Sequence, residues 1–192
     1  MNYWILTGGW ALYFVLHSLL AADKVKEWAG RTWGSAFRYY RLVYSIISTA
    51  GLLGLLILNG NMEAELFFKK EGFVRFMSLL LTTFGVMTIQ LAFRHYPLKS
   101  FLGFEPEKME LKIEGILKYV RHPVYAGLIL VITGFFLFLP NLPTLISCLC
   151  MLGYLPVGIW LEEKKLMAAF GEKYMNYRKN VPSIIPRLPV ES

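Results

Sequence analysis

The chain has 192 residues, of which 56% are hydrophobic, 16% are aromatic and only 17% are charged. With a mean hydropathy of +0.47, it is too apolar for a water-soluble domain of this length. The net charge of +7 does not indicate a nucleic-acid partner, because the basic residues are spread over three loops and no binding motif accompanies them.

Five apolar stretches meet or approach the roughly 20 residues that a helix needs to cross a bilayer. The first lacks a basic amino-terminal region and exceeds a signal-peptide core in length, so we expect it to be retained. The segment 140–143 reads Pro-Asn-Leu-Pro, which predicts a tight turn and makes the last two helices an antiparallel hairpin. We expect helices at residues 3–22, 42–58, 73–93, 123–139 and 142–161.

These stretches predict an all-α, polytopic membrane protein with about five transmembrane helices and a cytoplasmic cap. We expect one membrane domain, residues 1–192. Residues 1–93 would supply three amino-terminal helices, and residues 94–192 would supply a ligand-binding hairpin and a tail.

Charge predicts the orientation in the membrane. Lysine and arginine concentrate in the expected loops 23–41 and 94–121 and in the tail after residue 162, while the alternate loops carry few. By the positive-inside rule, the amino terminus lies outside and the carboxyl terminus lies in the cytoplasm. The basic loops also favour contact with anionic lipid headgroups, so membrane lipid is an expected partner.

Two polar motifs stand at the cytoplasmic ends of the predicted hairpin. The first is Arg-His-Pro-Val-Tyr-Ala-Gly at 121–127, in which Pro123 suits the first turn of a helix. The second is the adjacent pair Glu162 and Glu163. Because the two helices are antiparallel neighbours, both motifs should meet at one membrane face and form a single site.

The tail continues this pattern with Leu166, Phe170, Tyr174 and Tyr177, spaced as one stripe of an amphipathic helix. Such a stripe beside lysines is typical of a helix that lies on the membrane surface. Simple structural explanations therefore exist for each part. The Glu pair would be a solvated helix extension, and His122 would fill the entrance of its helix.

The order of these motifs resembles the carboxyl-terminal signature of a membrane methyltransferase superfamily. The string RHPVYAG, with Gly115 upstream and LEEKKLMAAFGEKYMNYRKNVPSIIP after one hairpin, is similar to isoprenylcysteine carboxyl methyltransferases and phospholipid methyltransferases over residues 115–186. The strings HSLLA at 17–21 and RYYRLVY at 38–44 are more similar to bacterial methanethiol S-methyltransferases and NnrU-type proteins. The resemblance implies an S-adenosylmethionine-dependent methyltransferase, in a bacterial inner membrane.

The resemblance also implies which residues contact the cofactor. An imidazole and a carboxylate suit the adenosine hydroxyls or the methionine amino group, and an aromatic face attracts a sulfonium. Tyr177 matches a family position beside the site. The residues expected to bind S-adenosylmethionine are His122, Pro123, Val124, Tyr125, Glu162 and Tyr174.

The methyl acceptor is less defined. The isoprenylcysteine enzymes carry an arginine four residues before the first Glu, where this chain has Gly158, which puts a carboxylate acceptor in doubt. A thiol is favoured, small or lipophilic, and an amine stays open. Because the sulfonium is a good leaving group, the main task expected of the protein is to position the reactants, and the sequence identifies no base. We expect Arg121, Glu163 and Arg178 to act in catalysis, and His17, Arg41, Tyr44 and Arg94 to contact the acceptor.

Three alternatives remain. His17, His95 and His122 are the only histidines, and imidazole is a common haem ligand. An NADPH-dependent reductase is another alternative, although the chain has no Gly-rich dinucleotide loop. The third is an NnrU-like membrane protein without enzymatic activity. We expect no metal site.

Overall fold

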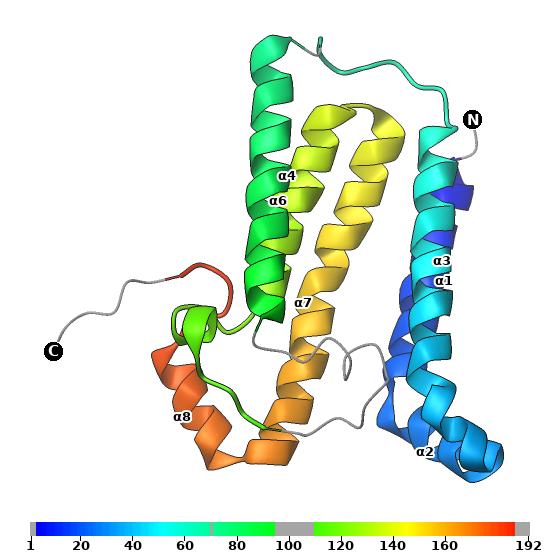
Figure 1. Ribbon diagram of the computed structural model, residues 1–192. Helices are drawn as coiled ribbons and strands as arrows, with labels where there is room; N and C mark the ends of the chain where they lie inside the picture. The colour runs from blue at the N-terminus through cyan, green and yellow to red at the C-terminus, as the bar shows by residue number, and fades with distance from the viewer. Residues whose placement is uncertain (1–2, 70, 95–109, 187–192) are drawn as a thin grey trace, which may run out of the picture.

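The computed structural model describes residues 3–69, 71–94 and 110–186, and these residues form a helical bundle (Figure 1). The described residues contain no strand, only one isolated bridge between Leu66 and Asn141. The expected all-α class is therefore confirmed. The bundle consists of α1 (Tyr3–Ala21), α3 (Tyr40–Gly60), α4 (Gly72–Phe93), α6 (Pro123–Phe138) and α7 (Leu142–Phe170).

Four helical stretches are long and apolar enough to cross a membrane. They are α1, α4, α7 and the stretch Asp23–Gly60, which includes α3. With 16 residues, α6 is shorter. Many large apolar side chains on these helices are exposed, such as Trp4, Phe73 and Leu149, as expected for surfaces that face lipid. The protein is an integral membrane protein.

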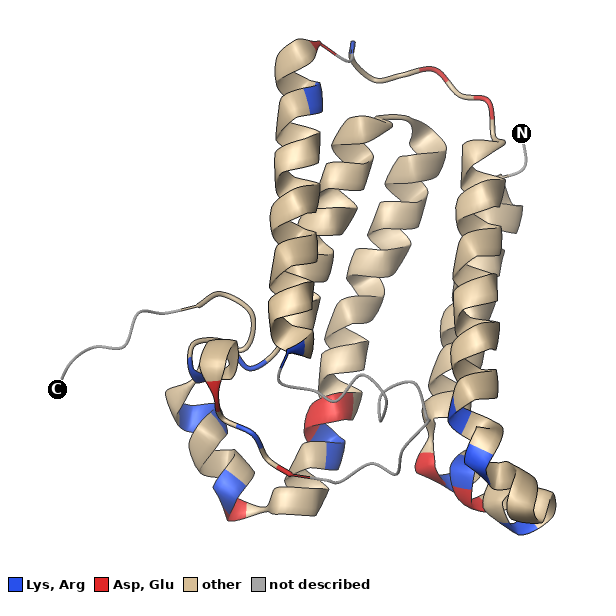
Figure 2. Ribbon diagram, viewed as in Figure 1, with Lys and Arg blue, Asp and Glu red and all other residues tan. Residues whose placement is uncertain are grey.

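Charged residues gather mainly at the end of the bundle that carries α2 (Asp23–Trp33) and α8 (Glu172–Asn180) (Figure 2). We call this the charged end. Two 3-10 helices, η1 (Gly34–Tyr39) and η2 (Gly115–Lys118), lie in connections at this end. The expected hairpin is confirmed: α6 leads away from the charged end, turns at residues 139–141, and α7 returns (Figure 1).

Two expectations about the charged end were wrong. The expected loop 23–41 is helical, because its sparse apolar residues recur with helical spacing and Ala29 is fully buried. The predicted single amphipathic helix in the tail is divided at Gly171, whose φ of +51° ends α7. Tyr174 and Tyr177 therefore belong to α8. They pack with Leu111 and Ile113 instead of lying on the membrane surface.

Close contact between α4 and α6 fixes the base of the hairpin. Gly85 and Gly127 face each other so closely that a Cβ on either would lie 2.6 Å from the other's carbonyl oxygen. Higher on the helix pair, Ser78 Oγ donates a 2.8 Å hydrogen bond to the Gly134 carbonyl. Small residues allow this approach of two backbones, which is how membrane helices commonly associate. The start of α6, which carries the Arg-His-Pro motif, is thereby held against α4.

A Gly127→Val substitution should lower thermal stability. The new side chain would overlap the Gly85 carbonyl and Ile89, and overpacking of this kind costs roughly 1–3 kcal/mol. Fluorescence-detected size-exclusion chromatography after heating measures the shift. Gly153→Val on α7 is the matched control, since a Cβ there meets nothing within 4 Å. Equal melting temperatures for the two variants would contradict the packing argument.

A buried polar network joins α1 and α3 to α7. Trp10 Nε1 donates to Ser147 Oγ at 2.9 Å, and Ser147 Oγ donates to Asn59 Oδ1 at 2.9 Å. Asn59 Nδ2 completes the network with a 3.2 Å bond to Thr144 Oγ1. These interhelical bonds set the position of the two amino-terminal helices relative to the hairpin.

Candidate active site

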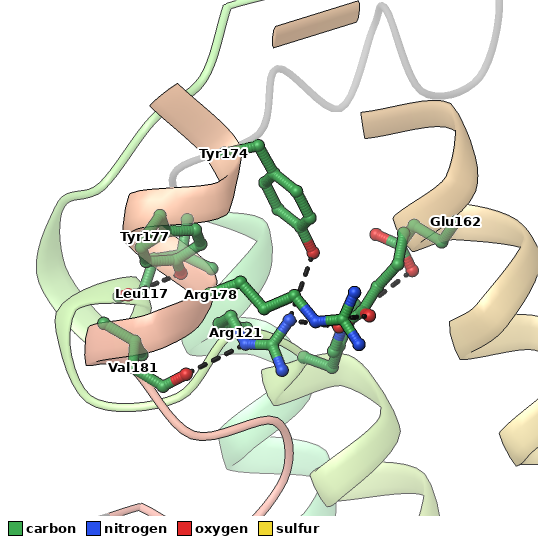
Figure 3. Close-up of polar contacts among 9 residues, drawn as sticks. Leu117, Arg121, Glu162, Tyr174, Tyr177, Arg178 and Val181 are labelled. Carbon is green, nitrogen blue, oxygen red and sulfur yellow. Dashed lines mark hydrogen bonds and ion pairs between the residues drawn. The ribbon is translucent and has the colours of Figure 1, made fainter. Parts of the chain in front are cut away.

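Arg121, just before α6, is the centre of a buried polar cluster at the charged end (Figure 3). Its guanidinium group forms an ion pair with Glu163 of α7. Its Nε donates a 2.9 Å hydrogen bond to the Val181 carbonyl, and Nη1 lies 3.3 Å from Tyr174 Oη. Burial raises the pKa of Tyr174, so its hydroxyl stays neutral and accepts from the arginine. One side chain thus ties together α6, α7, α8 and the segment after α8.

The segment after α8 folds back onto the Arg-His-Pro motif. The backbone amides of Arg121 and His122 donate to the carbonyls of Pro182 and Ser183, each at 2.9 Å. The Tyr177 hydroxyl donates a 2.6 Å bond to the Leu117 carbonyl of η2 (Figure 3). The tail and the motif, about 60 residues apart in sequence, therefore form one unit at the mouth of α6.

Glu163 is the anionic centre of the cluster. Besides Arg121, its carboxylate lies 3.2 Å from His122 Nε2 and 3.4 Å from Arg178 Nε. The Glu163 side chain is only 12% exposed. A buried carboxylate of this kind is tolerated because cations and donors surround it. Glu163 thus anchors the cluster by contacting Arg121, His122 and Arg178 together.

Glu162 has a different environment from its neighbour. Its side chain is 41% exposed, and its carboxylate interacts with the Tyr125 hydroxyl. One carboxylate oxygen lies 3.5 Å from His122 Nδ1, but that nitrogen is buried without a hydrogen-bond partner. A buried nitrogen without a partner is rare in a folded protein. The Glu162 carboxylate and the Tyr125 ring are the described groups nearest to this unsatisfied nitrogen.

Tyr125 is held on both sides. The His122 ring meets it edge to face, with 5.6 Å between ring centroids. On the other side, a Cβ at Gly158 would lie 3.0 Å from the Tyr125 hydroxyl. A larger residue at position 158 would displace this tyrosine, which gives a packing reason for glycine there. Of the other two motif residues, Pro123 is buried at the first turn of α6 and Val124 is half-buried beside it.

The residues expected to contact the acceptor lie in different places. His17 of α1 and Tyr44 of α3 touch inside the bundle, with Tyr44 Oη 3.1 Å from His17 Nε2. Tyr44 and Arg41 also line a cavity of about 140 Å³ between α1, α3 and α7 at the charged end. Arg94 is exposed just after α4. His95, which the haem alternative includes, lies outside the described residues.

Sequence reasoning missed part of the polar interior. Ser48 lies 3.2 Å from His17 Nδ1, and the Tyr154 ring meets the His17 ring. Four-residue spacing was the available signal: Tyr13 and His17 share one face of α1, and Tyr44 and Ser48 share one face of α3.

A second cavity, of about 370 Å³, was also missed. Its walls come mainly from apolar residues of α6 and α7, among them Ile129, Leu155 and Trp160. Glu163 and Ile184 also line it. No sequence motif marks it, because its lining residues look like ordinary membrane-helix residues.

Comparison with known proteins gives a match over nearly the whole chain. A family model described as NnrU protein matches residues 5–187. A methanethiol S-methyltransferase of Crocosphaera subtropica is 29% identical over 91% of this chain and 71% of its own length. Methanethiol S-methyltransferase 1 of Bradyrhizobium diazoefficiens is 26% identical over 92% of this chain and 64% of its own length.

A protein-S-isoprenylcysteine O-methyltransferase of Schizosaccharomyces pombe is 40% identical, over 41% of this chain and 34% of its own length. This chain therefore spans only part of the length of these relatives. No solved structure matches the chain.

Proposed function

The chain belongs to the NnrU protein family, and on this basis and the geometry of the charged end we propose that it is an S-adenosylmethionine-dependent methyltransferase of the membrane. The favoured acceptor is a small thiol. The observation that carries the proposal is the buried His122 Nδ1, which lacks a partner and faces the Glu162 carboxylate. The names of the relatives, which include S- and O-methyltransferases, support the same reaction class.

The donor set fits S-adenosylmethionine. His122 Nδ1 and the Glu162 carboxylate suit the ribose hydroxyls or the amino group of the cofactor. The Tyr125 ring offers an aromatic face to a cation. When bound, the cofactor supplies a methyl group on a positively charged sulfur that leaves readily. Pro123 and Val124 would line the same pocket, and Tyr174 would support it from α8.

Arg121, Glu163 and Arg178 act mainly by holding the site together in this proposal. Their mutual contacts fix the mouth of α6 against α7, so that His122 and Glu162 keep their relative positions. For methyl transfer, such positioning of the reactants and exclusion of water account for most of the rate acceleration. Arg94, exposed after α4, would attract an anionic acceptor from solution.

The acceptor would bind in the cavity lined by Arg41 and Tyr44. About 140 Å³ is the size of an engineered cavity that holds benzene, and it is too small for a prenyl chain. The basic residues at this cavity favour a thiolate. A lipophilic acceptor would instead use the apolar cavity between α6 and α7. We place the charged end in the cytoplasm of a bacterial inner membrane, following the positive-inside rule.

Transfer of a radiolabelled methyl group from S-adenosylmethionine tests the proposal with purified protein. The acceptors are a small alkyl thiol, a prenylcysteine analogue and phosphatidylethanolamine. We expect labelled thioether with the alkyl thiol and calorimetric binding of the cofactor. If the prenylcysteine analogue or the lipid were labelled and the alkyl thiol were not, the acceptor site would be assigned to the larger cavity. Absence of product with all three, together with absence of cofactor binding, would overturn the proposed function.

A further inference from the structure

A histidine and a tyrosine form an unusual polar pair inside the amino-terminal helices. His17 of α1 and Tyr44 of α3 are both half-buried, and the Tyr44 hydroxyl lies 3.1 Å from His17 Nε2. Ser48, one turn after Tyr44, places its Oγ 3.2 Å from His17 Nδ1. Ionisable groups within membrane helices are costly and are commonly functional. The cofactor site described above uses neither His17 nor Ser48.

The arrangement around His17 defines a proton acceptor. The Tyr44 hydroxyl lies 3.1 Å from His17 Nε2 and 3.2 Å from His17 Nδ1. When Nδ1 carries the proton and donates it to Ser48 Oγ, Nε2 is the ring nitrogen left to accept a proton from Tyr44. Within the part of the chain that the structure describes, the other titratable groups that face His17 are phenols, Tyr13 of its own helix and Tyr154 of α7. These phenols are neutral near pH 7, so they leave the imidazole free to take up a proton.

Tyr44 connects this pair to the small cavity at the charged end. Tyr44 lines the cavity and its hydroxyl contacts His17, which is itself outside the cavity wall. Lys26, Arg41 and Lys165 line the same cavity. Lys26 and Lys165 both approach the single carboxylate of Asp23, at 3.5 and 3.2 Å. Among the described residues, two lysines of this cavity therefore share one carboxylate, and the positive charge left over stabilises an anion inside it.

The small cavity also reaches the helix that carries part of the cofactor site. Lys165, which lines the cavity, lies three residues after Glu162 on α7 and shares its side of the helix. A ligand in the small cavity would thus lie against Tyr44 of α3 and against the part of α7 that carries Glu162 one turn earlier.

We propose that His17 is the general base for the thiol acceptor and that Tyr44 relays the proton, an inference that rests on the proposed function. The thiol proton passes to Tyr44 Oη while the Tyr44 proton passes to His17 Nε2. The resulting thiolate forms a bond to the methyl carbon as the bond from that carbon to the donor sulfur breaks. The electron pair of the broken bond stays on the donor sulfur. His17 then releases its proton to water.

Two thiols that differ in acidity test this relay. An alkyl thiol is mostly protonated at neutral pH and needs a base, whereas an aryl thiol of similar size is largely ionised already. We expect Tyr44→Phe and His17→Asn to lower kcat/KM for the alkyl thiol by about 10²-fold, the lower range for general-base catalysis. Activity with the aryl thiol should change less than threefold. Raising the pH should restore alkyl-thiol activity, as the thiolate forms in solution.

Tyr154→Phe is the matched control, because it removes a phenol that also faces His17 but is bonded to Ser18 at 2.8 Å. Tyr154→Phe should leave the activity with the alkyl thiol and with the aryl thiol unchanged. A readout apart from turnover comes from histidine labelled with ¹⁵N. In protein saturated with S-adenosylhomocysteine, binding of the alkyl thiol should shift the His17 signals toward the imidazolium form, and Tyr44→Phe should abolish the shift.

Equal losses with alkyl and aryl thiols would mean that His17 and Tyr44 only shape the cavity, and would overturn the relay. An unchanged rate in both variants would do the same. Either result leaves the proposed function intact as long as wild-type protein methylates a thiol. If wild-type protein methylates no thiol, the proposed acceptor fails and the relay fails with it.

Discussion

Replacing Glu162 by glutamine should weaken S-adenosylmethionine binding at least tenfold while leaving the fold intact. The change removes a charged hydrogen-bond acceptor, and such a bond contributes roughly 1.5–3 kcal/mol. Glu162 is 41% exposed, and Arg121 pairs with Glu163 and not with it, so the substitution leaves the buried ion pair in place. Isothermal titration calorimetry measures the affinity, and thermal melting without ligand measures the fold.

His122→Ala should weaken binding as well, because it removes the buried Nδ1 that lacks a partner. Glu172→Gln is the matched control: it makes the same chemical change in the first turn of α8, at an exposed residue. It should bind the cofactor like the wild type. If both the Glu162 and the His122 variants bound S-adenosylmethionine with wild-type affinity, the assignment of the cofactor site to these residues would be wrong.

Replacing Arg121 by methionine should unfold the cap formed by α8 and the segment after it. Arg121 is the main partner of a carboxylate that is only 12% exposed, and removal of one member of a buried pair costs about 3–5 kcal/mol. The substitution also loses the bonds to Val181 and Tyr174. Limited proteolysis should cleave the tail well below the temperature at which the helix bundle melts.

Arg178→Met is the control for this experiment. Arg178 contacts the same Glu163 carboxylate but is 53% exposed, and exposed ion pairs contribute about 0–1 kcal/mol. Combining Arg121→Met with Glu163→Gln should recover part of the stability, since no unpaired charge then stays buried. Equal proteolysis of the Arg121 and Arg178 variants would contradict the central position given to Arg121.

Much of the fold was predictable because it depends on local composition. Apolar length located the membrane helices, and the Pro-Asn-Leu-Pro segment at 140–143 located the hairpin turn. Helical content at the charged end was underestimated. α2 is too polar for a hydropathy criterion, yet its single buried residue, Ala29, still packs on the bundle. The division of the tail at Gly171 was also missed, because the stripe through Leu166 and Tyr174 keeps helical spacing across the break.

It was predictable that the two polar motifs meet at one site, because the hairpin that brings them together was predictable. Antiparallel neighbours bring their ends together, so residues 121–125 and the Glu pair had to meet. The return of residues 181–183 to Arg121 was not predictable, because it depends on backbone hydrogen bonds without a side-chain signature. The same holds for both cavities, whose walls combine residues from several helices.

By itself, the sequence determined that this is a helical membrane protein with a polar site at one end of a hairpin, since hydropathy and motif order are properties of the chain. Only the tertiary structure assigned different surroundings to Glu162 and Glu163. Adjacent residues on a helix point about 100° apart, and the rotation of α7 against α6 decides which one meets Arg121. That rotation is set by side-chain packing along the whole helix, around Ile132, Cys148 and Leu155.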